Sequence, residues 1–327
     1  MTAIIILNWN GYKDTIECLD SLFNCQNDFF IVVVDNGSSN NSVEYIKKHL
    51  EEHNTPIAFV KYGDTLKDTP QNHQVIIYPT GQNLGFAKGN NEALRMLSKL
   101  DINNYLLLNN DTIVESTFLD GLLSFHETHP QYEVLTPLIC FESKRDIVWN
   151  AGGKLFCGLR KYYYANKSRS CVKEHVYKDI TFVTGCALFF TKSVLRKDGG
   201  IFTEDFFFGE EDFNFSLTMK ANKRKMACVV SSLIYHKVGA STKQKFLIGK
   251  LYIHYLNRFI DVKRNYSAYF YFAWKYINAL YIITLLTKRG YNLIESTRFI
   301  RKVINDAKQK NNVTYNDFIS AIENKTK

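Results

Sequence analysis

Three adjacent carboxylates form the most conspicuous chemical feature of this sequence: Glu210, Glu211 and Asp212. They follow directly after an apolar run of three phenylalanines, Phe206 to Phe208. Placing this much charge beside this much aromatic surface costs free energy unless the carboxylates serve a purpose. Two interpretations remain open from this segment alone. The acids are used in binding or chemistry, or they begin a helix, where negative charge is favourable.

A second segment has the chemistry of a cation site. In YLLLNNDTIVE, at 105–115, a run of apolar residues stops abruptly at Asn109, Asn110 and Asp111. A carboxylate beside amide side chains at the end of a strand suits a hard cation such as Mg²⁺ or Mn²⁺. Upstream, GQNLGFAKGNN places three glycines (81, 85 and 89) just before the helix pattern NEALRMLSKL. Backbone amides at such a helix start can face an anion, although these glycines match neither GxGxxG nor a Walker loop.

The elements that must position these residues alternate between strand and helix. AIIILNWN predicts a buried strand that begins at residue 3 and leaves no room for a signal peptide. Residues 14–22 fit a helix, and FFIVVVDNGSSN predicts a second strand that ends in a polar turn. This alternation favours an α/β fold with a parallel sheet, whose ligands bind at the carboxyl ends of the strands. Ordinary turn chemistry would explain any one polar turn, but here the turns recur at successive strand ends.

The segment from 208 to 242 continues the pattern. After the carboxylates come a helix pattern, a strand and a turn that contains His236, in YHKVGAST. Between these segments, residues 140–180 are the hardest to interpret, and RKYYYANKSR suggests a loop, either mobile over an acceptor or simply solvated. His126, His129 and His175 have no partner motif, so we expect them to be structural.

Taken together, these segments resemble the inverting family 2 glycosyltransferases, which have the GT-A fold. The resemblance covers roughly residues 2 to 265 and rests on six motifs in family order: ILNWN, VVVDNGSSN, NLGFAKGNN, LNNDTIV, FFFGEEDFN and YHKVGAST. It is most similar to bacterial enzymes that build surface polysaccharide, many of them rhamnosyltransferases. The implied architecture is a mostly parallel, Rossmann-like sheet flanked by helices, with a helical extension at the C-terminus.

The resemblance implies a set of residues that bind the nucleotide-sugar. Trp9 stands where the family places an aromatic ring against the base, and Asp35 where an aspartate bonds the pyrimidine edge. Asn83 and Gly85 match the turn that approaches the donor, and Gly185, in FVTGCALFF, matches a glycine at the sugar pocket.

The metal motif of the family is an aspartate-x-aspartate, and here it reads Asn109, Asn110, Asp111. The first acid is therefore missing. Asp111 matches the metal-binding aspartate, with Asn110 beside the donor, and His236 matches a late histidine that some members use as a further ligand. The missing acid weakens the expected affinity for Mn²⁺ or Mg²⁺ and makes His236 more important.

The acidic motif implies the catalytic base. Asp212 matches the general base, with Glu211 before it, and Asn214 replaces the acid that the family often has two residues later. Glu210 and Glu211 remain alternatives by proximity. Such a base deprotonates the acceptor hydroxyl as that hydroxyl attacks the anomeric carbon, and a divalent cation stabilises the departing nucleoside diphosphate. The neighbouring carboxylates would raise the pKa of the base toward a useful value.

Composition limits the remaining choices. The chain has 327 residues and is 46% hydrophobic, enough for a full core in one large domain or two. Its seven cysteines show no metal-binding spacing, which is typical of reduced thiols buried in a cytoplasmic protein.

The basic charge is concentrated at the C-terminus. Residues 243–327 hold 16 Lys and Arg against 5 Asp and Glu, a balance of +11, while the whole chain carries +9. Within this region the aromatic, nearly uncharged run 269–287 is flanked by basic residues, at 263, 264, 288 and 289. We expect helices that touch an anionic membrane surface. A helical oligomer interface or plain core is the alternative; a membrane span and nucleic-acid binding are less favoured, since Lys275 interrupts the run and no nucleic-acid motif is present.

The sequence therefore predicts a GT-A catalytic domain at 1–242, with a nucleotide-sugar half at about 1–115 and an acceptor half at about 116–242, followed by a basic helical region at 243–327. The expected activity is metal-dependent, inverting transfer of a hexose or deoxyhexose, such as rhamnose, from a UDP- or dTDP-sugar to a glycan or lipid-linked glycan. Two alternatives stay open: a sugar nucleotidyltransferase, and a non-catalytic scaffold of a membrane assembly complex. The expected location is the cytoplasm, at the inner face of the cell membrane.

Overall fold

The computed structural model describes residues 1–172, 176–238 and 247–323. The chain divides into two compact units, one of residues 1–202 with 215–240 and the other of residues 203–214 with 241–327. His175, the end of the YHKVGAST motif and the predicted boundary after residue 242 lie outside the described residues.

The first unit is built on an eleven-stranded sheet, as far as the described residues show. The main path runs β11-β13-β7-β12-β5-β1-β2-β4-β3, with β6 paired to β13 and β8 to β7. Strands β3, β4, β2, β1 and β5 are mutually parallel, β7 is parallel to β13, and β12 runs antiparallel to β5 and β7. The strands are β1 (Thr2–Asn8), β2 (Phe29–Asp35), β3 (Ile57–Phe59), β4 (Val75–Pro79), β5 (Asn104–Asn109), β6 (Thr112–Val114), β7 (Tyr132–Phe141), β8 (Lys144–Asn150), β11 (Tyr177–Ile180), β12 (Ala187–Thr191) and β13 (Lys225–His236).

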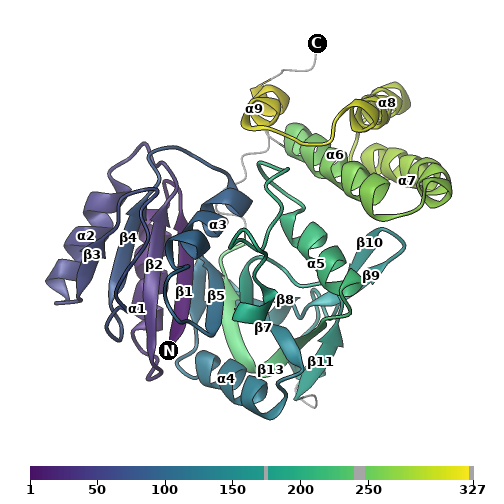
Figure 1. Cartoon of the computed structure of the whole chain (residues 1–327). Helices are drawn as coiled ribbons and strands as arrows, with labels where there is room; N and C mark the ends of the chain where they lie inside the picture. The colour runs from purple at the N-terminus through teal and green to yellow at the C-terminus, as the bar shows by residue number, and fades with distance from the viewer. Residues whose placement is uncertain (173–175, 239–246, 324–327) are drawn as a thin grey trace. The chain divides into compact units, whose positions relative to one another are not determined.

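Helices cover both faces of this sheet, as Figure 1 shows. Successive side chains of a strand point to opposite faces, so Ile4 and Ile6 pack in one core and Ile5 in the other. The first core is closed by α1 (Tyr12–Leu22), α2 (Ser42–Glu52) and α4 (Phe118–Thr128). The second is closed by α3 (Phe86–Met96) and the later residues of α5 (Glu211–Ala221). The predicted α/β architecture, a mostly parallel central sheet flanked by helices, is confirmed.

Helix α3 differs from its sequence prediction. NEALRMLSKL predicts a helix at 91–100, whereas α3 starts at Phe86 and ends at Met96. Gly85, with a φ of 82°, precedes the first turn, and Gly89 lies inside the helix. A Cβ on Gly89 would lie 2.7 Å from the Leu7 side chain. The glycine therefore permits close packing of α3 on β1, and this tertiary contact outweighs the low helix propensity of glycine.

Residues 140–180 could not be interpreted from the sequence, except that a loop was expected at 160–169. Most of this segment forms strands: the end of β7, then β8, then the hairpin of β9 (Gly153–Phe156) and β10 (Leu159–Tyr162), a short 3₁₀ turn at Arg169–Cys171, and β11. Arg160 and Lys161 thus stand on a hairpin strand. The Arg160 guanidinium lies 5.5 Å from the centre of the Tyr162 ring and 5.2 Å from that of Phe182, so it makes cation–π contacts on this hairpin.

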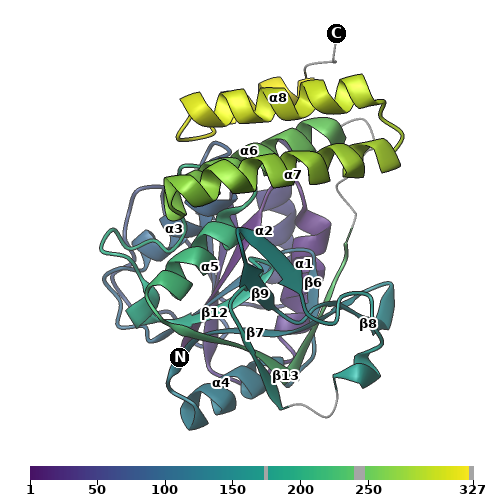
Figure 2. The same cartoon turned by 90° about the vertical axis from the view of Figure 1, so that its right-hand side faces the viewer.

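The second unit is a helical bundle with its own core. It contains α6 (Leu247–Asn265), α7 (Ala268–Lys288), α8 (Leu293–Gln309) and α9 (Tyr315–Glu323). Figure 2 shows α6, α7 and α8 lying side by side. The core includes Trp274, Leu256 and Val303, together with Phe206 from the segment before the acidic cluster. None of the described helices is long and apolar enough to cross a membrane.

Candidate active site

The polar strand ends predicted from the sequence lie at one edge of the sheet. Asn8 pairs with Asp35, and Leu7 pairs with Asn109, so β1, β2 and β5 end level with one another. Asp35 is buried and accepts hydrogen bonds from Asn8 Nδ2 at 2.8 Å and Ser38 Oγ at 2.6 Å. Its second carboxylate oxygen accepts from the Ser38 backbone at 3.2 Å. Asp35 is therefore held rigidly at the edge where a ligand of this fold would bind.

The asparagine-glycine turn packs directly against the end of β2. Asn36 donates to Asn83 Oδ1 at 3.1 Å and to the Gly85 carbonyl at 3.2 Å, and it accepts from the Leu84 amide at 2.9 Å. A Cβ on Gly37 would lie 2.3 Å from the Gln82 backbone, so glycine permits this close approach. The structure thus brings Asp35, Asn83 and Gly85 together. Asn36, which joins them, was missed from the sequence because an asparagine in a polar turn has no distinctive signal.

Trp9 follows β1 at the same edge, and 57% of its surface is exposed. Its neighbour Asn10 adopts a φ of 56°, and its side-chain oxygen accepts from the backbone amides of Ser39 and Asn40. These bonds fix the turn after β1 to the turn after β2. An exposed indole on a fixed turn presents a flat apolar face, which suits stacking against a nucleoside base.

Asn110 makes contacts within the protein at the start of α1. Its side-chain amide donates to the Gly11 carbonyl at 3.3 Å and to Thr15 Oγ1 at 3.1 Å. A Cβ on Gly11 would lie 2.7 Å from this amide. Asn110 therefore orients the turn that leads to Asp111.

Asp111 and His236 face each other at the end of β5. Asp111 Oδ1 lies 3.1 Å from His236 Nε2. Strand pairing places them there, since Thr112 of β6 is opposite His236 of β13 and the Lys237 amide donates to the Asp111 carbonyl at 2.9 Å. The Trp149 ring packs edge-on against the imidazole, 4.4 Å between centroids. Burial opposes protonation of this ring, but the neighbouring Cys186 and Asp111 outweigh it and raise the pKa of His236 to about 10.

This pair fits two neighbouring ligands of a divalent cation, which would have to displace the proton that His236 shares with Asp111. Two ligand atoms at about 2.1 Å from an octahedral ion subtend roughly 3 Å, which matches the observed separation. Within the described parts of the chain, no group of three His, Cys, Asp or Glu side chains could hold a metal ion. The remaining ligands would have to come from a diphosphate and water, as is usual for Mg²⁺ and Mn²⁺ at phosphate-transfer sites.

Gly185 lies close to this pair. It occupies the turn before β12, where the Asn109 amide donates to the Cys186 carbonyl at 2.8 Å. The Cys186 thiol is buried against His236, and burial raises its pKa. Gly185 is thus adjacent to the end of β5, which carries Asn109, Asn110 and Asp111.

The three carboxylates of the acidic segment, in the second unit, are not equivalent. Glu211 and Asp212 occupy the first turn of α5, as the helix-start interpretation predicts. Glu210 is buried with a φ of 72°, and forms ion pairs with Arg258 and, at 2.7 Å, with His254. Burial and the neighbouring Asp212 raise the pKa of the Glu211 carboxyl to about 8. Asp212 is partly exposed. Glu210 therefore has a structural partner, which leaves Asp212 and Glu211 as the candidates for the base.

A buried aspartate near this segment should make stability depend on pH. Burial raises the pKa of Asp261 to about 8, against about 4 when unfolded, despite a hydrogen bond from Asn214 at 2.6 Å. Between these two pH values the folded state binds a proton that the unfolded state lacks. The stability that Asp261 contributes is therefore complete below pH 4 and is lost as pH rises through 8. Asp261→Asn should flatten the decline of the thermal midpoint between pH 5 and 8. An unchanged slope would show that Asp261 is ionised throughout.

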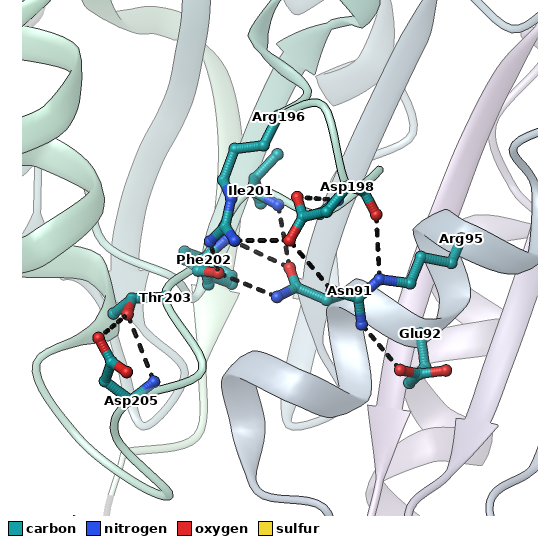
Figure 3. Close-up of polar contacts among 10 residues, drawn as sticks. Asn91, Glu92, Arg95, Arg196, Asp198, Ile201, Phe202, Thr203 and Asp205 are labelled. Carbon is teal, nitrogen blue, oxygen red and sulfur yellow. Dashed lines mark hydrogen bonds and ion pairs between the residues drawn. The ribbon is translucent and has the colours of Figure 1, made fainter. Parts of the chain in front are cut away.

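The segment that precedes the acidic cluster is fixed to α3. Figure 3 shows the Asn91 side chain directed toward Ile201 and Phe202; it accepts from both of their amides and donates to the Phe202 carbonyl at 3.0 Å. Arg196 donates to the same carbonyl at 2.6 Å and pairs with Asp198 at 2.5 Å. A Cβ on Gly200 would lie 2.7 Å from Asn91. These residues hold the chain just before it enters the second unit. Asn91 is the last residue of the NLGFAKGNN motif, whereas no motif pointed to Arg196, Asp198 or Gly200.

Comparison with known proteins identifies the class. The chain belongs to glycosyl transferase family 2, whose family model matches residues 3–199. No curated protein matches it. Among solved structures, it is similar to S. aureus TarS 1–349 (14% identity, TM-score 0.50, covering 98% of this chain and 81% of that one).

Two further solved structures show the same fold. The mannosyltransferase PcManGT from Pyrobaculum calidifontis, in complex with GDP-Man and Mn²⁺, has 14% identity and a TM-score of 0.55 over 95% of this chain and 86% of that one. GalNAc-T7 with UDP, GalNAc and Mn²⁺ has 12% identity and a TM-score of 0.56 over 98% of this chain and 56% of that one. At these identities the likeness concerns the fold. The protein is thus a glycosyltransferase with a GT-A-like fold.

Proposed function

We propose that this glycosyltransferase inverts the anomeric centre of a nucleotide-diphosphate-sugar and passes the sugar to a hydroxyl of a glycan or lipid-linked glycan, in bacterial surface polysaccharide synthesis. The observation that carries the proposal is the alignment of Asp35, Asp111 and His236 at one edge of a family 2 sheet. A nucleoside-binding carboxylate and a candidate cation pair at the same edge suit a diphosphate ligand.

In this proposal, each residue has one task. Trp9 stacks on the base, Asp35 accepts a hydrogen bond from its edge, and Asn83, Gly85 and Gly185 shape the sugar side of the pocket. Asp111 and His236 would hold Mn²⁺ or Mg²⁺, which when bound supplies Lewis-acid stabilisation of the diphosphate. Asp212 takes the proton from the acceptor hydroxyl. Glu211 keeps a proton at neutral pH, because its pKa is about 8, and does not compete for that role.

The donor is proposed to be a UDP- or dTDP-sugar, with rhamnose as the leading deoxyhexose. TarS has been solved with UDP-GlcNAc and PcManGT with GDP-Man, so a donor screen should include all three nucleotides. Thermal-shift measurements with Mn²⁺ should find a stabilising UDP- or dTDP-sugar. Stabilisation only by a GDP-sugar would overturn the nucleotide assignment.

Two alternative functions, a sugar nucleotidyltransferase and a non-catalytic scaffold, make different predictions from this one. A sugar nucleotidyltransferase would usually need a glycine-rich, basic N-terminal loop to activate a triphosphate, and ILNWNGYKD has no such loop. A scaffold that retains the fold would bind a donor without turning it over. The missing first acid at Asn109 is the feature that favours the scaffold.

The proposed acceptor is presented at an anionic membrane surface, which α7 would touch at the cytoplasmic side. The outward face of α7 exposes Tyr269, Tyr276, Ile277 and Leu280, and the helix contains no acidic residue. An exposed face of aromatic and aliphatic side chains, in a region with a +11 charge balance, complements an anionic leaflet.

Two of the basic residues expected to contact the membrane are used inside the second unit. Lys263 donates to the carbonyls of Ala307 and Lys310, at 2.6 and 3.1 Å, and burial and Arg264 lower its pKa. Arg264 pairs with Asp205 at 2.7 Å. Replacing them would also remove contacts within the second unit, so a loss of vesicle binding would have two explanations. Lys288 and Arg289 are both exposed and are therefore the suitable probes of membrane contact.

Vesicle binding tests this surface. Lys288→Gln with Arg289→Gln should weaken co-sedimentation with phosphatidylserine vesicles about thirtyfold, since each basic residue contributes about 1 kcal/mol. Tyr276→Ser with Leu280→Ser should also release the protein, whereas Phe59→Ser, which removes an exposed aromatic from the first unit, should not. Wild-type protein that stays in the supernatant at low salt, and forms a dimer that Leu280→Ser disrupts, would show that α7 is an oligomer interface instead.

A further inference from the structure

One face of helix α6 is polar although it is buried in the second unit. His254, Asn257, Arg258 and Asp261 follow the spacing i, i+3, i+4, i+7, which places them on the same side of a helix. Asn257 and Asp261 are completely buried, and Arg258 is 6% exposed. Burying this many polar side chains costs free energy unless each one has a partner.

All four side chains contact residues 208–214, the acidic segment that contains the three adjacent carboxylates. Asn257 Nδ2 donates to the carbonyls of Phe208 and Gly209, at 3.0 and 2.7 Å. Arg258 and His254 pair with Glu210, and the guanidinium also lies 3.7 Å from the centre of the Phe213 ring. Asp261 accepts from Asn214 Nδ2 at 2.6 Å. These contacts attach residues 208, 209, 210, 213 and 214 to α6. Glu211 and Asp212 are therefore flanked in the sequence, on both sides, by residues that α6 holds.

The backbone between these anchors has a conformation that needs support. Gly209 and Glu210 both have positive φ, 87° and 72°. That region is unfavourable for a residue with a Cβ, so Glu210 stays there only because surrounding contacts hold it. The ion pairs of Glu210 with α6 are contacts of this kind. They fix the point at which the chain turns into α5, and thereby the direction in which Asp212 leaves the backbone.

We infer that Asn257 and Arg258 are positioning residues for the base. The inference rests on the proposed role of Asp212. The base must lie within hydrogen-bond reach of the acceptor hydroxyl, so turnover falls steeply when its carboxylate is displaced. Donor binding should not depend on α6, because the proposed donor residues, Asp35 and Asn83 among them, belong to the first unit.

The test separates turnover from donor binding. Arg258→Gln should lower kcat about 10²-fold, the effect of a displacement of about 1 Å, with donor KM and calorimetric donor affinity unchanged. Arg258→Lys should recover about tenfold of that loss, since it restores one charge-assisted hydrogen bond to Glu210. Asn257→Ala, which leaves every charge in place, should also lower kcat and not KM. Arg264→Gln is the matched control, because it removes an arginine that pairs with Asp205, outside the acidic segment, and should keep kcat within a few-fold.

The outcomes distinguish this inference from the proposed function. Folded Asn257→Ala and Arg258→Gln variants with wild-type kcat, alongside an Asp212→Asn variant that has lost activity, would overturn the positioning role and leave the base assignment intact. Equal losses in Arg258→Gln and Arg264→Gln would show general destabilisation of the bundle and would also overturn it. Should Arg258→Gln not fold, the Asn257→Ala result decides alone. Normal turnover in Asp212→Asn would instead overturn the proposed base.

Discussion

Asp212→Asn is expected to lower turnover by about 10² to 10⁴, the usual contribution of a positioned general base. The substitution keeps the shape of the side chain and removes its basicity. Asp212 lies in the first turn of α5 beside Glu211, whose raised pKa keeps it protonated at neutral pH. Glu210 is engaged by Arg258, so neither neighbour is expected to replace the base. The measurement is steady-state turnover of the donor, with donor affinity determined separately by calorimetry and expected to be unchanged.

Glu211→Gln is the matched control for this prediction. It changes a carboxyl that is already neutral near pH 7, so it should affect turnover far less than Asp212→Asn does. The Glu211→Gln variant and the wild-type enzyme should differ in charge only as the pH rises through 8. The reverse ranking would transfer the role of base to Glu211. Near-normal turnover in both variants would exclude the acidic segment from proton transfer.

The second large effect concerns the cation pair. Asp111→Ala and His236→Ala should each weaken Mn²⁺-dependent binding of a nucleoside diphosphate by about tenfold or more, because each removes one of the two proposed protein ligands. Calorimetric titration of the diphosphate, with and without Mn²⁺, measures this without relying on activity. Binding in the absence of Mn²⁺ should be similar in all three proteins.

Asp14→Asn provides the control for this pair. It removes a partly exposed carboxylate that pairs with Lys237, next to His236, and should leave the Mn²⁺ dependence unchanged. Activity that persists in saturating chelator would contradict the metal assignment. The charge of the leaving group would then have to be stabilised by basic side chains.

The architecture of the sheet could be predicted from the sequence because its signals are local. Ile4, Ile6 and Val32 belong to continuous apolar runs that are typical of a strand buried on both faces, and each run ends in polar residues. Parallel strands end at a common edge, so Asp35 and Asp111 could be assigned to one region without a structure. The helical nature of 269–287 was equally evident from its length.

The remaining features depend on contacts that are distant in the sequence. Nothing near Glu210 shows that Arg258, 48 residues away, will neutralise it. The sequence predicts that Lys263 is an exposed membrane-binding lysine, because it does not show that α8 places the Ala307 carbonyl beside it. The strands β8 to β10 were missed because they are short and rich in basic and polar residues, a composition that resembles a surface loop.

The central claim is that this protein consumes a nucleotide-sugar by breaking the bond between the anomeric carbon and the diphosphate. The most direct test is ³¹P NMR of purified protein incubated with Mn²⁺ and a panel of UDP-, dTDP- and GDP-sugars. The account predicts that at least one UDP- or dTDP-sugar yields its nucleoside diphosphate, and that Asp212→Asn slows this reaction when a glycan acceptor is present. Release of a sugar 1-phosphate and a nucleoside triphosphate when pyrophosphate is added would indicate nucleotidyl transfer. Donor binding without any product, with or without pyrophosphate, would indicate a scaffold; either result would contradict the account.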